Sequence, residues 1–428
     1  MRTMKDSGIE WIGEIPAEWI CDKVCRQFAL IGSGTTPKSD NDSNYIGNIH
    51  WIQSGDINGG ILHNTKNKVS NEVIEKYSAL KVYKAPFIVI AMYGASIGNI
   101  SSSIIDGCVN QACCVLSEGH MNIKYAFYTL KSAKDYLIYN GVGGGQPNIS
   151  QDIVKQLRLP VPSIREQEMI ADYLDKKCAE IDAVIEKTKA TIEEYKKLKQ
   201  SIITEAVTKG IRGNRPMKDS GIEWIGEIPA EWNVVKMKHL GKCRNGLTYS
   251  PENLVSEDEG ILVLRSSNIK DGRLAFTDNV YVNSEVREEL MVKAGDILIC
   301  SRNGSRALIG KNALIPEGLY ASFGAFMMIF RCQSPKYVQM VLNSAVFSYY
   351  LGTFLTSTIN QLTADNFNNM QIVYCEDETE QEEITQYLDK KCAEIDTLIA
   401  RKTALLAEME SYKKSVIYEY VTGKKEVR

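Results

Sequence analysis

The sequence MKDSGIEWIGEIPAEW occurs twice in the chain, at residues 4–19 and again at residues 217–232, with all sixteen positions identical. A second string, YLDKKCAEID, occurs at residues 173–182 and 387–396. The two copies of the first string are 213 positions apart and those of the second string 214, so both repeats have nearly the same offset. Self-similarity at a fixed offset indicates a tandem duplication. Each half comprises a strap (4–19, 217–232), a middle segment (20–160, 233–375) and a tail (161–209, 376–428).

The two tails have the apolar spacing of coiled-coil helices, which alternates between four and three positions. Charged residues fill the remaining positions, as on a solvated helix surface. We expect the two helices to pair, because seams of equal length and register can bury each other; two separate amphipathic helices lying on their domains are the alternative. About forty-five helical residues would extend roughly 65 Å. The seam consists of Leu174, Cys178, Ile181, Ile185, Thr188, Ile192, Tyr195, Lys199, Ile202 and Ala206 in the first tail, and Leu388, Cys392, Ile395, Ile399, Lys402, Leu406, Met409, Lys413, Val416 and Tyr420 in the second.

The middle segments share only loose motifs, in contrast to the identical straps. WIQSGDI at 51–57 matches VLRSSNI at 263–269, and KAPFIVIAMYGASIG at 84–98 matches KAGDILICSRNGSRALIG at 293–310. Short apolar runs punctuated by Gly and Asn predict strands, and residues 125–139 predict a helix, so we expect an α+β fold. The two halves therefore share a frame and differ in the surfaces they present.

The composition excludes several classes of protein. Residues are 44% hydrophobic and 24% charged, which is typical of a globular chain. The sequence has neither an eighteen-residue apolar run nor an apolar signal core, so we expect no membrane association and a cytoplasmic location. Eleven cysteines without a Cys-x-x-Cys pair indicate buried thiols in a reducing compartment. The four histidines are scattered, and we expect no metal site.

Motifs for catalysis are missing. Residues 304–312, GSRALIGKN, have five residues where a nucleotide P-loop has four, and Asn312 replaces the magnesium-binding Ser or Thr. Residues 32–37, GSGTTP, lack the third glycine of a dinucleotide turn. No adjacent prolines occur, so the loop with which amino-methyltransferases hold a flipped base is absent. We therefore expect no catalytic residue in this chain, and a methyltransferase or nuclease with a degenerate motif is a disfavoured alternative.

The straps, tails and loops resemble the specificity subunit of type I restriction-modification systems, over essentially the whole chain. The most specific marks are the strap and LPVPSIREQEMIADYLDKKCAEID at 159–182, with KAGDILI at 293–299 as another. The resemblance implies an α+β fold: two globular α/β target-recognition domains separated by two long antiparallel coiled-coil helices, with a pseudo-twofold internal repeat. The corresponding segments are a first recognition domain with its strap at 1–160, a central spacer helix at 161–209, a linker with the repeated strap and second recognition domain at 210–375, and a C-terminal spacer helix at 376–428.

The same resemblance implies a non-catalytic subunit that reads a two-part double-stranded DNA target, one half-site per domain. It would recruit two copies of the methyltransferase subunit, and restriction or translocase subunits in the full complex. S-adenosylmethionine, ATP and magnesium are expected in those partners. Identical partners need identical docking surfaces, which the straps would supply; straps that are merely core strands left alike by duplication are the alternative. A coiled-coil scaffold that reads no DNA is the alternative function. The tryptophans suited either to partner contacts or to a core are Trp11, Trp19, Trp224 and Trp232.

Charge gives DNA binding only modest support. The net charge is −3 overall, while residues 20–160 carry thirteen basic against ten acidic residues and residues 233–375 carry fourteen against twelve. We expect the partners to supply part of the grip on phosphate. Base edges are read by polar and arginine-bearing loops. The candidates for DNA contact are Ser33, Thr35, Thr36, Lys38, Gln53, Tyr93 and Ser96 in the first half, and Arg244, Asn245, Arg265, Arg302, Asn303 and Arg306 in the second.

Overall fold

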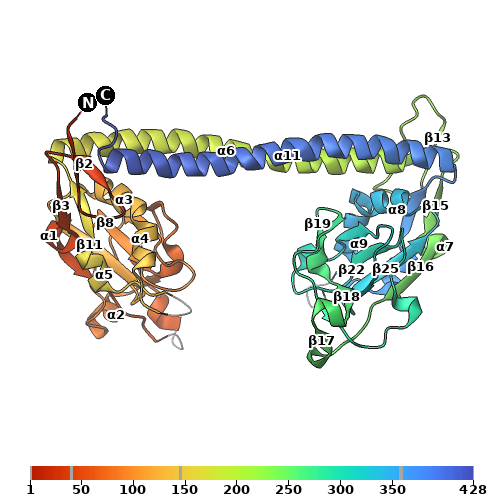
Figure 1. The fold of residues 1–428 in the computed structure, drawn as a ribbon, viewed down its shortest axis with the longest axis horizontal. Helices are drawn as coiled ribbons and strands as arrows, with labels where there is room; N and C mark the ends of the chain where they lie inside the picture. The colour runs from red at the N-terminus through yellow and green to blue at the C-terminus, as the bar shows by residue number, and fades with distance from the viewer. Residues whose placement is uncertain (1, 39–41, 144–146, 356–359, 428) are drawn as a thin grey trace. The chain divides into compact units, whose positions relative to one another are not determined.

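The computed structural model describes residues 2–38, 42–143, 147–355 and 360–427. The chain divides into two compact units: unit 1 contains the residues up to Thr188 and those from Ala404 onward, and unit 2 is Lys189–Thr403. The two long helices, α6 (Ile164–Lys209) and α11 (Glu378–Val421), each contribute to both units (Figure 1). Each unit therefore contains part of both tails.

Both long helices have the terminal residues that a helix needs. Ser163 Oγ accepts a hydrogen bond from the backbone N–H of Glu166 (3.3 Å), and Asp377 caps α11 by accepting from Thr379 N (2.9 Å). At the other ends Gly210 and Gly423 adopt left-handed backbone conformations, with φ of 74° and 71°. Glycine takes this conformation without steric cost, so it ends a helix readily.

The helices pair in opposite directions within each unit. In unit 1 the Tyr173 and Tyr420 rings lie 4.4 Å apart, and further along α6 Lys413 Nζ donates to Asp182 at 2.6 Å. In unit 2 Lys199 Nζ donates to Asp396 at 2.7 Å, and these two residues are the repeat counterparts of Lys413 and Asp182. All twenty seam residues are buried or half-buried. The predicted antiparallel coiled coil and internal repeat are confirmed.

Unit 1 is an α+β domain built on a five-stranded sheet of order β4-β11-β8-β9-β6 and a three-stranded sheet of order β10-β5-β7. The central strand β8 is buried along its whole length because its apolar sequence FIVIA faces protein on both sides. The remaining pairs are the strap hairpin β1-β2 and β12-β3. The strands are β1 Met4–Asp6, β2 Glu14–Pro16, β3 Ile20–Lys23, β4 Phe28–Gly32, β5 Ile49–Ile52, β6 Ile61–Leu62, β7 Asn67–Val69, β8 Phe87–Ala91, β9 Ile100–Ser103, β10 Gly107–Val109, β11 Cys113–Gly119 and β12 Arg158–Val161, and the short helices α1 Val24–Gln27, α2 Asn71–Lys76, α3 Ile123–Ser132, α4 Lys134–Tyr139 and α5 Gln151–Gln156.

Unit 2 repeats this plan with two four-stranded sheets, β16-β25-β22-β23 and β17-β21-β18-β24. Its strap hairpin is β13-β14, and the pair β15-β26 corresponds to β3-β12 of unit 1. The strands are β13 Met217–Asp219, β14 Glu227–Pro229, β15 Asn233–Lys236, β16 Gly241–Asn245, β17 Leu254–Val255, β18 Ile261–Leu264, β19 Ile269–Lys270, β20 Arg273–Leu274, β21 Tyr281–Val282, β22 Ile297–Cys300, β23 Asn312–Leu314, β24 Ala321–Phe323, β25 Met327–Cys332 and β26 Gln371–Tyr374, and the short helices α7 Met237–Leu240, α8 Pro335–Leu342, α9 Ala345–Phe354 and α10 Ala364–Asn369.

The long helices present nearly the same apolar residues to both domains. The core of unit 1 includes side chains from the start of α6 and the end of α11, and the core of unit 2 includes the repeat counterparts from the start of α11 and the end of α6. The two apolar helix surfaces are therefore nearly equivalent, and the same domain fold can pack on either of them. The counterparts are Ile170 and Ile384, Leu174 and Leu388, Cys178 and Cys392, Ile417 and Ile203, and Val421 and Val207.

Candidate nucleic-acid interface and partner surface

In unit 1 four strands end at one edge of the domain. Strands β5 and β10 are parallel and paired at their last residues, Ile52 with Val109. Strands β4 and β8 both run antiparallel to β11 and end opposite its first residues. The segments that follow these four strands form what we call the loop edge of unit 1, and they carry the candidates Ser33, Gln53 and Tyr93.

Polar side chains of this edge bond to one another. Thr36 Oγ1 donates to the side-chain oxygen of Gln111 at 2.6 Å, and Ser33 Oγ donates to the Gln111 carbonyl at 3.3 Å. Asn67 Nδ2 donates to Gln53 Oε1 at 2.9 Å. The structure thus brings Ser33 and Thr36 together on Gln111 and orients the Gln53 amide.

The other candidates of the first half lie less centrally. Thr35 is half-buried and its carbonyl accepts from the indole of Trp51 at 3.3 Å. Lys38 is exposed and its backbone N–H donates to the Tyr77 hydroxyl at 3.2 Å. Ser96 is half-buried in the turn after Tyr93. Only Lys38 of these three has an exposed side chain.

Unit 2 has the corresponding loop edge, formed by the segments that follow β16, β18, β22 and β24. Strands β18 and β24 are parallel, with Leu264 paired to Phe323. After β22 the backbone N–H groups of Ser301 and Arg302 both donate to the carbonyl of Phe326, at 3.0 and 3.1 Å. This edge carries Arg265, Arg302 and Asn303, and Asn245 is the last residue of β16 beside it. Asn303 Nδ2 donates to Ser266 Oγ, next to Arg265, at 3.1 Å.

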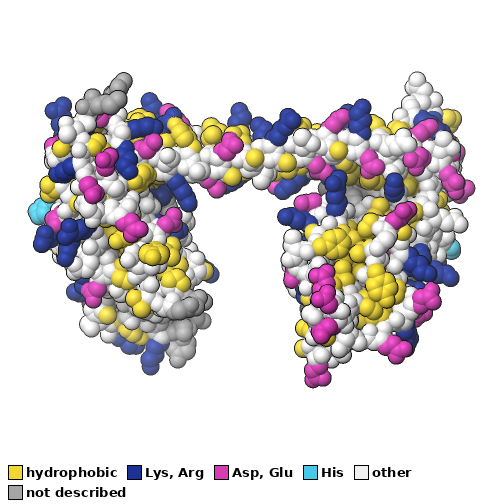
Figure 2. All heavy atoms as spheres, in the orientation of Figure 1, with side chains coloured by type: hydrophobic (Ala, Val, Ile, Leu, Met, Phe, Trp, Pro, Cys, Tyr) yellow, Lys and Arg dark blue, Asp and Glu magenta, His cyan; other side chains and the backbone are white. Residues whose placement is uncertain are grey.

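The arginines of the second half differ in their charge environment. Arg244 is paired with Glu289 at 2.9 Å and Arg265 with Asp278 at 2.8 Å. Arg302 and Arg306 form no ion pair with the residues described; Arg306 donates to the Gly352 carbonyl at 3.3 Å. On the face shown in Figure 2, basic and acidic side chains are interspersed and no single basic patch dominates. Arg302 and Arg306 are therefore the candidate arginines of the second half that have no acidic partner among the described residues.

The two loop edges share backbone geometry and differ in side chains. Gln53 and Arg265 each precede a 3-10 helix and donate their backbone N–H to its third residue, at 2.9 Å in both units. The carbonyl just before β11, from Ala112, accepts from Met92 N at 2.7 Å, as the carbonyl just before β25, from Phe326, accepts from Ser301. By this equivalence Gln53 corresponds to Arg265, Ala112 to Phe326, and Tyr93 to Arg302.

Three side chains at these edges were not identified from the sequence: Asn67, Gln111 and Phe326. Gln111 and Phe326 lie within the three residues before β11 and β25, whose sequences CCVL and MMIF indicate only buried strands. Superimposing the two halves on these strands, as GCVNQACCVL and ASFGAFMMIF, would have drawn attention to them. Neither Gln nor Phe in a short turn is distinctive without that comparison.

The straps form the same hairpin in both units, and their tryptophans divide into two kinds. Trp19 and Trp232 are each 1% exposed and belong to the cores, so they have almost no surface to offer a partner. Trp11 and Trp224 are half-buried; Trp224 stacks on Tyr349 with ring centroids 4.4 Å apart. The structure favours the core role for the first pair, and a partner contact remains a proposal for Trp11 and Trp224.

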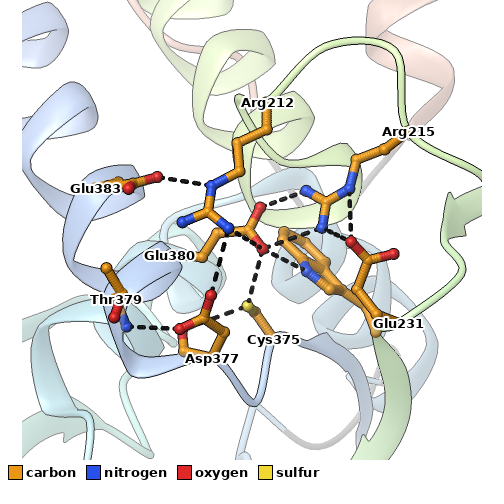
Figure 3. Close-up of polar contacts among 9 residues, drawn as sticks. Arg212, Arg215, Glu231, Cys375, Asp377, Thr379, Glu380 and Glu383 are labelled. Carbon is orange, nitrogen blue, oxygen red and sulfur yellow. Dashed lines mark hydrogen bonds and ion pairs between the residues drawn. The ribbon is translucent and has the colours of Figure 1, made fainter.

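Ion pairs fasten each strap to a long helix. In unit 2 Arg215, just before the strap, donates to Glu380 in the first turn of α11 (3.0 Å) and to Glu231 (3.1 Å), while the Trp232 indole N–H donates to Glu380 at 3.2 Å (Figure 3). Arg212 adds contacts to Glu383 and Asp377 in the same cluster. Burial raises the pKa of Glu380, but the bonds from Arg215 and Trp232 outweigh it and the pKa lies below the usual value.

Unit 1 repeats this arrangement with different outer residues. Arg2 pairs with Glu166 in the first turn of α6, and also with Glu18 at 3.1 Å and Glu426 at 2.9 Å. The pKa of Glu166 is again lowered, because bonding to Arg2 exceeds the opposing effect of burial. Equivalent straps are thus held in equivalent positions on the helix starts.

Among the residues that the structure describes, no cluster of His, Cys, Asp and Glu could hold a metal ion. Burial raises the pKa of the Cys108 and Cys113 thiols to about 12, which makes them poor nucleophiles. In the same described residues, no helix has the length and apolar character to cross a membrane.

Comparisons with known proteins agree with one another. A family model for the type I restriction modification DNA specificity domain matches residues 25–194. The type I restriction enzyme MjaVIII specificity subunit of Methanocaldococcus jannaschii is 27% identical over 319 residues, which are 72% of this chain and 71% of that protein. The StySPI specificity subunit of Salmonella potsdam is 25% identical over 205 residues, 46% of this chain and 44% of that protein.

A solved structure shows the same fold. A chain from work on complex assembly and conformational transition of the type I R-M system superimposes with a TM-score of 0.72 at 15% identity, covering 96% of this chain and 99% of that chain. The family model and the curated relatives point to the same kind of protein, and the solved structure shows its fold. This chain is similar to type I restriction-modification specificity subunits.

Proposed function

We propose that this chain is the non-catalytic, sequence-reading subunit of a type I restriction-modification complex, and that each unit reads one half of a two-part DNA target through its loop edge. One observation carries the proposal: the two loop edges have the same backbone frame but present different polar side chains. A DNA target with two different halves requires two DNA-binding surfaces with different side chains, and a duplicated backbone fold can supply both. Hydrogen bonds to base edges supply the sequence information.

The second part of the proposal concerns partners. The straps and helix starts remain alike, so they offer two equivalent docking surfaces to two copies of one methyltransferase subunit. Trp11 and Trp224 would contribute to these surfaces, as aromatic residues often do at interfaces. Restriction or translocase subunits would join the full complex in the cytoplasm. S-adenosylmethionine, ATP and magnesium would then be bound by the partner subunits.

The modest positive charge of residues 20–160 and 233–375 fits a shared grip on DNA. Few arginines of the loop edges lack an acidic partner, so the phosphate contribution from this chain should be small. Contacts made by the methyltransferase subunits would supply the rest. This division predicts weak DNA binding by the chain alone and tight, sequence-dependent binding by the complex.

A filter-binding assay with randomised duplex DNA, with and without the methyltransferase subunit, tests the proposal. We expect the complex to enrich a two-part sequence and the chain alone to bind weakly. A complex that assembles but enriches no sequence would support the alternative of a coiled-coil scaffold that reads no DNA. Methyl transfer by the purified chain alone would contradict the non-catalytic role.

A further inference from the structure

Phe326 is a large apolar side chain at the loop edge of unit 2, and 58% of it is exposed. A single exposed phenylalanine is common on protein surfaces and by itself needs no explanation. This one is distinctive because the Arg302 guanidinium carbon lies over its ring, 5.2 Å from the centroid. At that distance the ring attracts the cation and favours a defined position for it.

The backbone joins the same two residues. The N–H groups of Ser301 and Arg302 both donate to the carbonyl of Phe326, and Leu362 N donates to the Ser301 carbonyl at 2.7 Å. The turn that carries Arg302 is therefore fixed from two sides. Both the backbone and the ring restrict Arg302 before a ligand binds. Its side chain therefore loses less conformational entropy when the guanidinium binds a ligand.

Arg302 also differs from its neighbours in electrostatic state. Arg244 and Arg265 form ion pairs with Glu289 and Asp278, whereas Arg302 is in no ion pair with the residues described. A guanidinium that lies on an aromatic face keeps its edge N–H donors available. That edge matches the paired O6 and N7 acceptors of guanine in the major groove.

We propose that Phe326 is a positioning residue that holds Arg302 as the guanine-contacting side chain of unit 2. The inference rests on the proposed function, and it names both the base and a residue outside the predicted set. Unit 1 has Ala112 at the position of Phe326 and Tyr93 at that of Arg302. The guanine contact therefore belongs to one half-site only, and the other half-site serves as an internal control.

The test uses the full chain assembled with its methyltransferase subunits and a randomised duplex library. The variants are Arg302→Ala, Phe326→Ala and Phe326→Trp, with Tyr320→Ala as the matched control. Tyr320 is 72% exposed and precedes β24, at the end of that strand opposite the loop edge. Circular dichroism of each variant establishes that the fold is retained.

We expect Arg302→Ala and Phe326→Ala to relax the preference for guanine at the same single position. The loss for Phe326→Ala should be about five- to thirty-fold, since only the positioning of Arg302 is lost. Phe326→Trp should restore the preference because indole also holds a guanidinium. Tyr320→Ala should leave both half-sites unchanged.

Three outcomes would overturn the inference. Phe326→Ala could leave the guanine preference intact while Arg302→Ala removes it, so that Phe326 has no positioning role. Arg302→Ala could weaken all sequences alike and reduce the salt dependence of binding, which indicates a phosphate contact. In both cases the wild-type complex still selects a two-part target, and the proposed function stands. A wild-type complex that selects no sequence overturns the proposed function as well.

Discussion

At the scale of single residues, the strap is held by a carboxylate that is almost inaccessible to water. The Glu380 side chain is 1% exposed and that of its partner Arg215 10%, whereas the counterpart Glu166 is 23% exposed. Removing one partner of a buried ion pair leaves an uncompensated charge, and this costs more than losing a surface pair. We therefore expect the Glu380 cluster to contribute more to the free energy of unfolding than the Glu166 cluster.

Glu380→Gln should lower the free energy of unfolding of unit 2 by about 3 kcal/mol at neutral pH. The folded-state pKa of Glu380 lies below its unfolded value, so its stabilisation is complete above the unfolded pKa of about 4.3 and disappears as pH falls through the lower folded value. The difference between variant and wild type should thus shrink on acidification below about pH 5. Thermal unfolding between pH 3 and 8 measures this.

Glu166→Gln is the matched control, and we expect a smaller loss because Glu166 is more accessible to solvent. A Glu380→Gln variant whose deficit is equally large at pH 3 and pH 7 would show that the stabilisation does not depend on the carboxylate charge.

Gln111 carries a second prediction for a single residue. Its side-chain oxygen is already held by Thr36, which leaves the amide N–H₂ for an acceptor on DNA. Gln111→Ala should cost about 1 to 3 kcal/mol for the cognate duplex and relax one position of one half-site. Lys38→Ala should instead weaken all sequences alike, as expected for a phosphate contact. Competition binding with single-base variants of the target separates the two effects, and an identical profile for both variants would refute the assignment.

At the scale of elements, the paired helices depend on their seam. Ile185 is 6% exposed at a seam position, and its neighbour Val184 is 47% exposed outside the seam. Ile185→Ala should lower the free energy of unfolding by about 2 to 4 kcal/mol, and Val184→Ala should change it by less than about 0.5 kcal/mol. Denaturant unfolding followed by circular dichroism provides the measurement. Equal effects at the two positions would mean that the helices are not packed through this seam.

The elements could be predicted from the sequence where a period or a repeat was strong. The heptad spacing located both long helices, and the runs FIVIAM and DILICS located β8 and β22. Residues 125–139, expected as one helix, form α3 and α4 with Ala133 between them. Apolar periodicity continues across that residue, so the break left no signal in the pattern.

The loop edges were harder to predict because their partners come from distant strands. Arginines 244 and 265 look alike in sequence to Arg302, yet acidic residues from other segments neutralise them. Likewise, Trp19 and Trp11 lie in one repeated string, but only the fold buries the first and leaves part of the second exposed. The strand topology determines which acidic residues lie beside each arginine and which tryptophan is buried. The sequence alone does not show which distant segments become neighbours, so these contacts could not be predicted from it.

Over the whole molecule, the proposed function gives each unit an interchangeable reading surface on a common frame. The segments 20–162 and 233–375 have equal lengths, and each ends at the carbonyl that accepts from the first glutamine of a long helix, Gln167 at 2.9 Å or Gln381 at 2.7 Å. The apolar helix residues that pack against the two domains are also nearly the same. A chain that carries the first segment in both places should therefore fold.

The decisive measurement is the DNA target of that chimaera, in which residues 20–162 replace residues 233–375, assembled with the methyltransferase subunits and selected against randomised duplex DNA. In the proposed function the two units read the DNA with pseudo-twofold symmetry, so we expect a palindromic target: the half-site of unit 1 followed by its inverted copy. A folded and assembled chimaera that keeps the original second half-site, or that reads only one half-site, would contradict the claim that each unit reads its own half of the DNA.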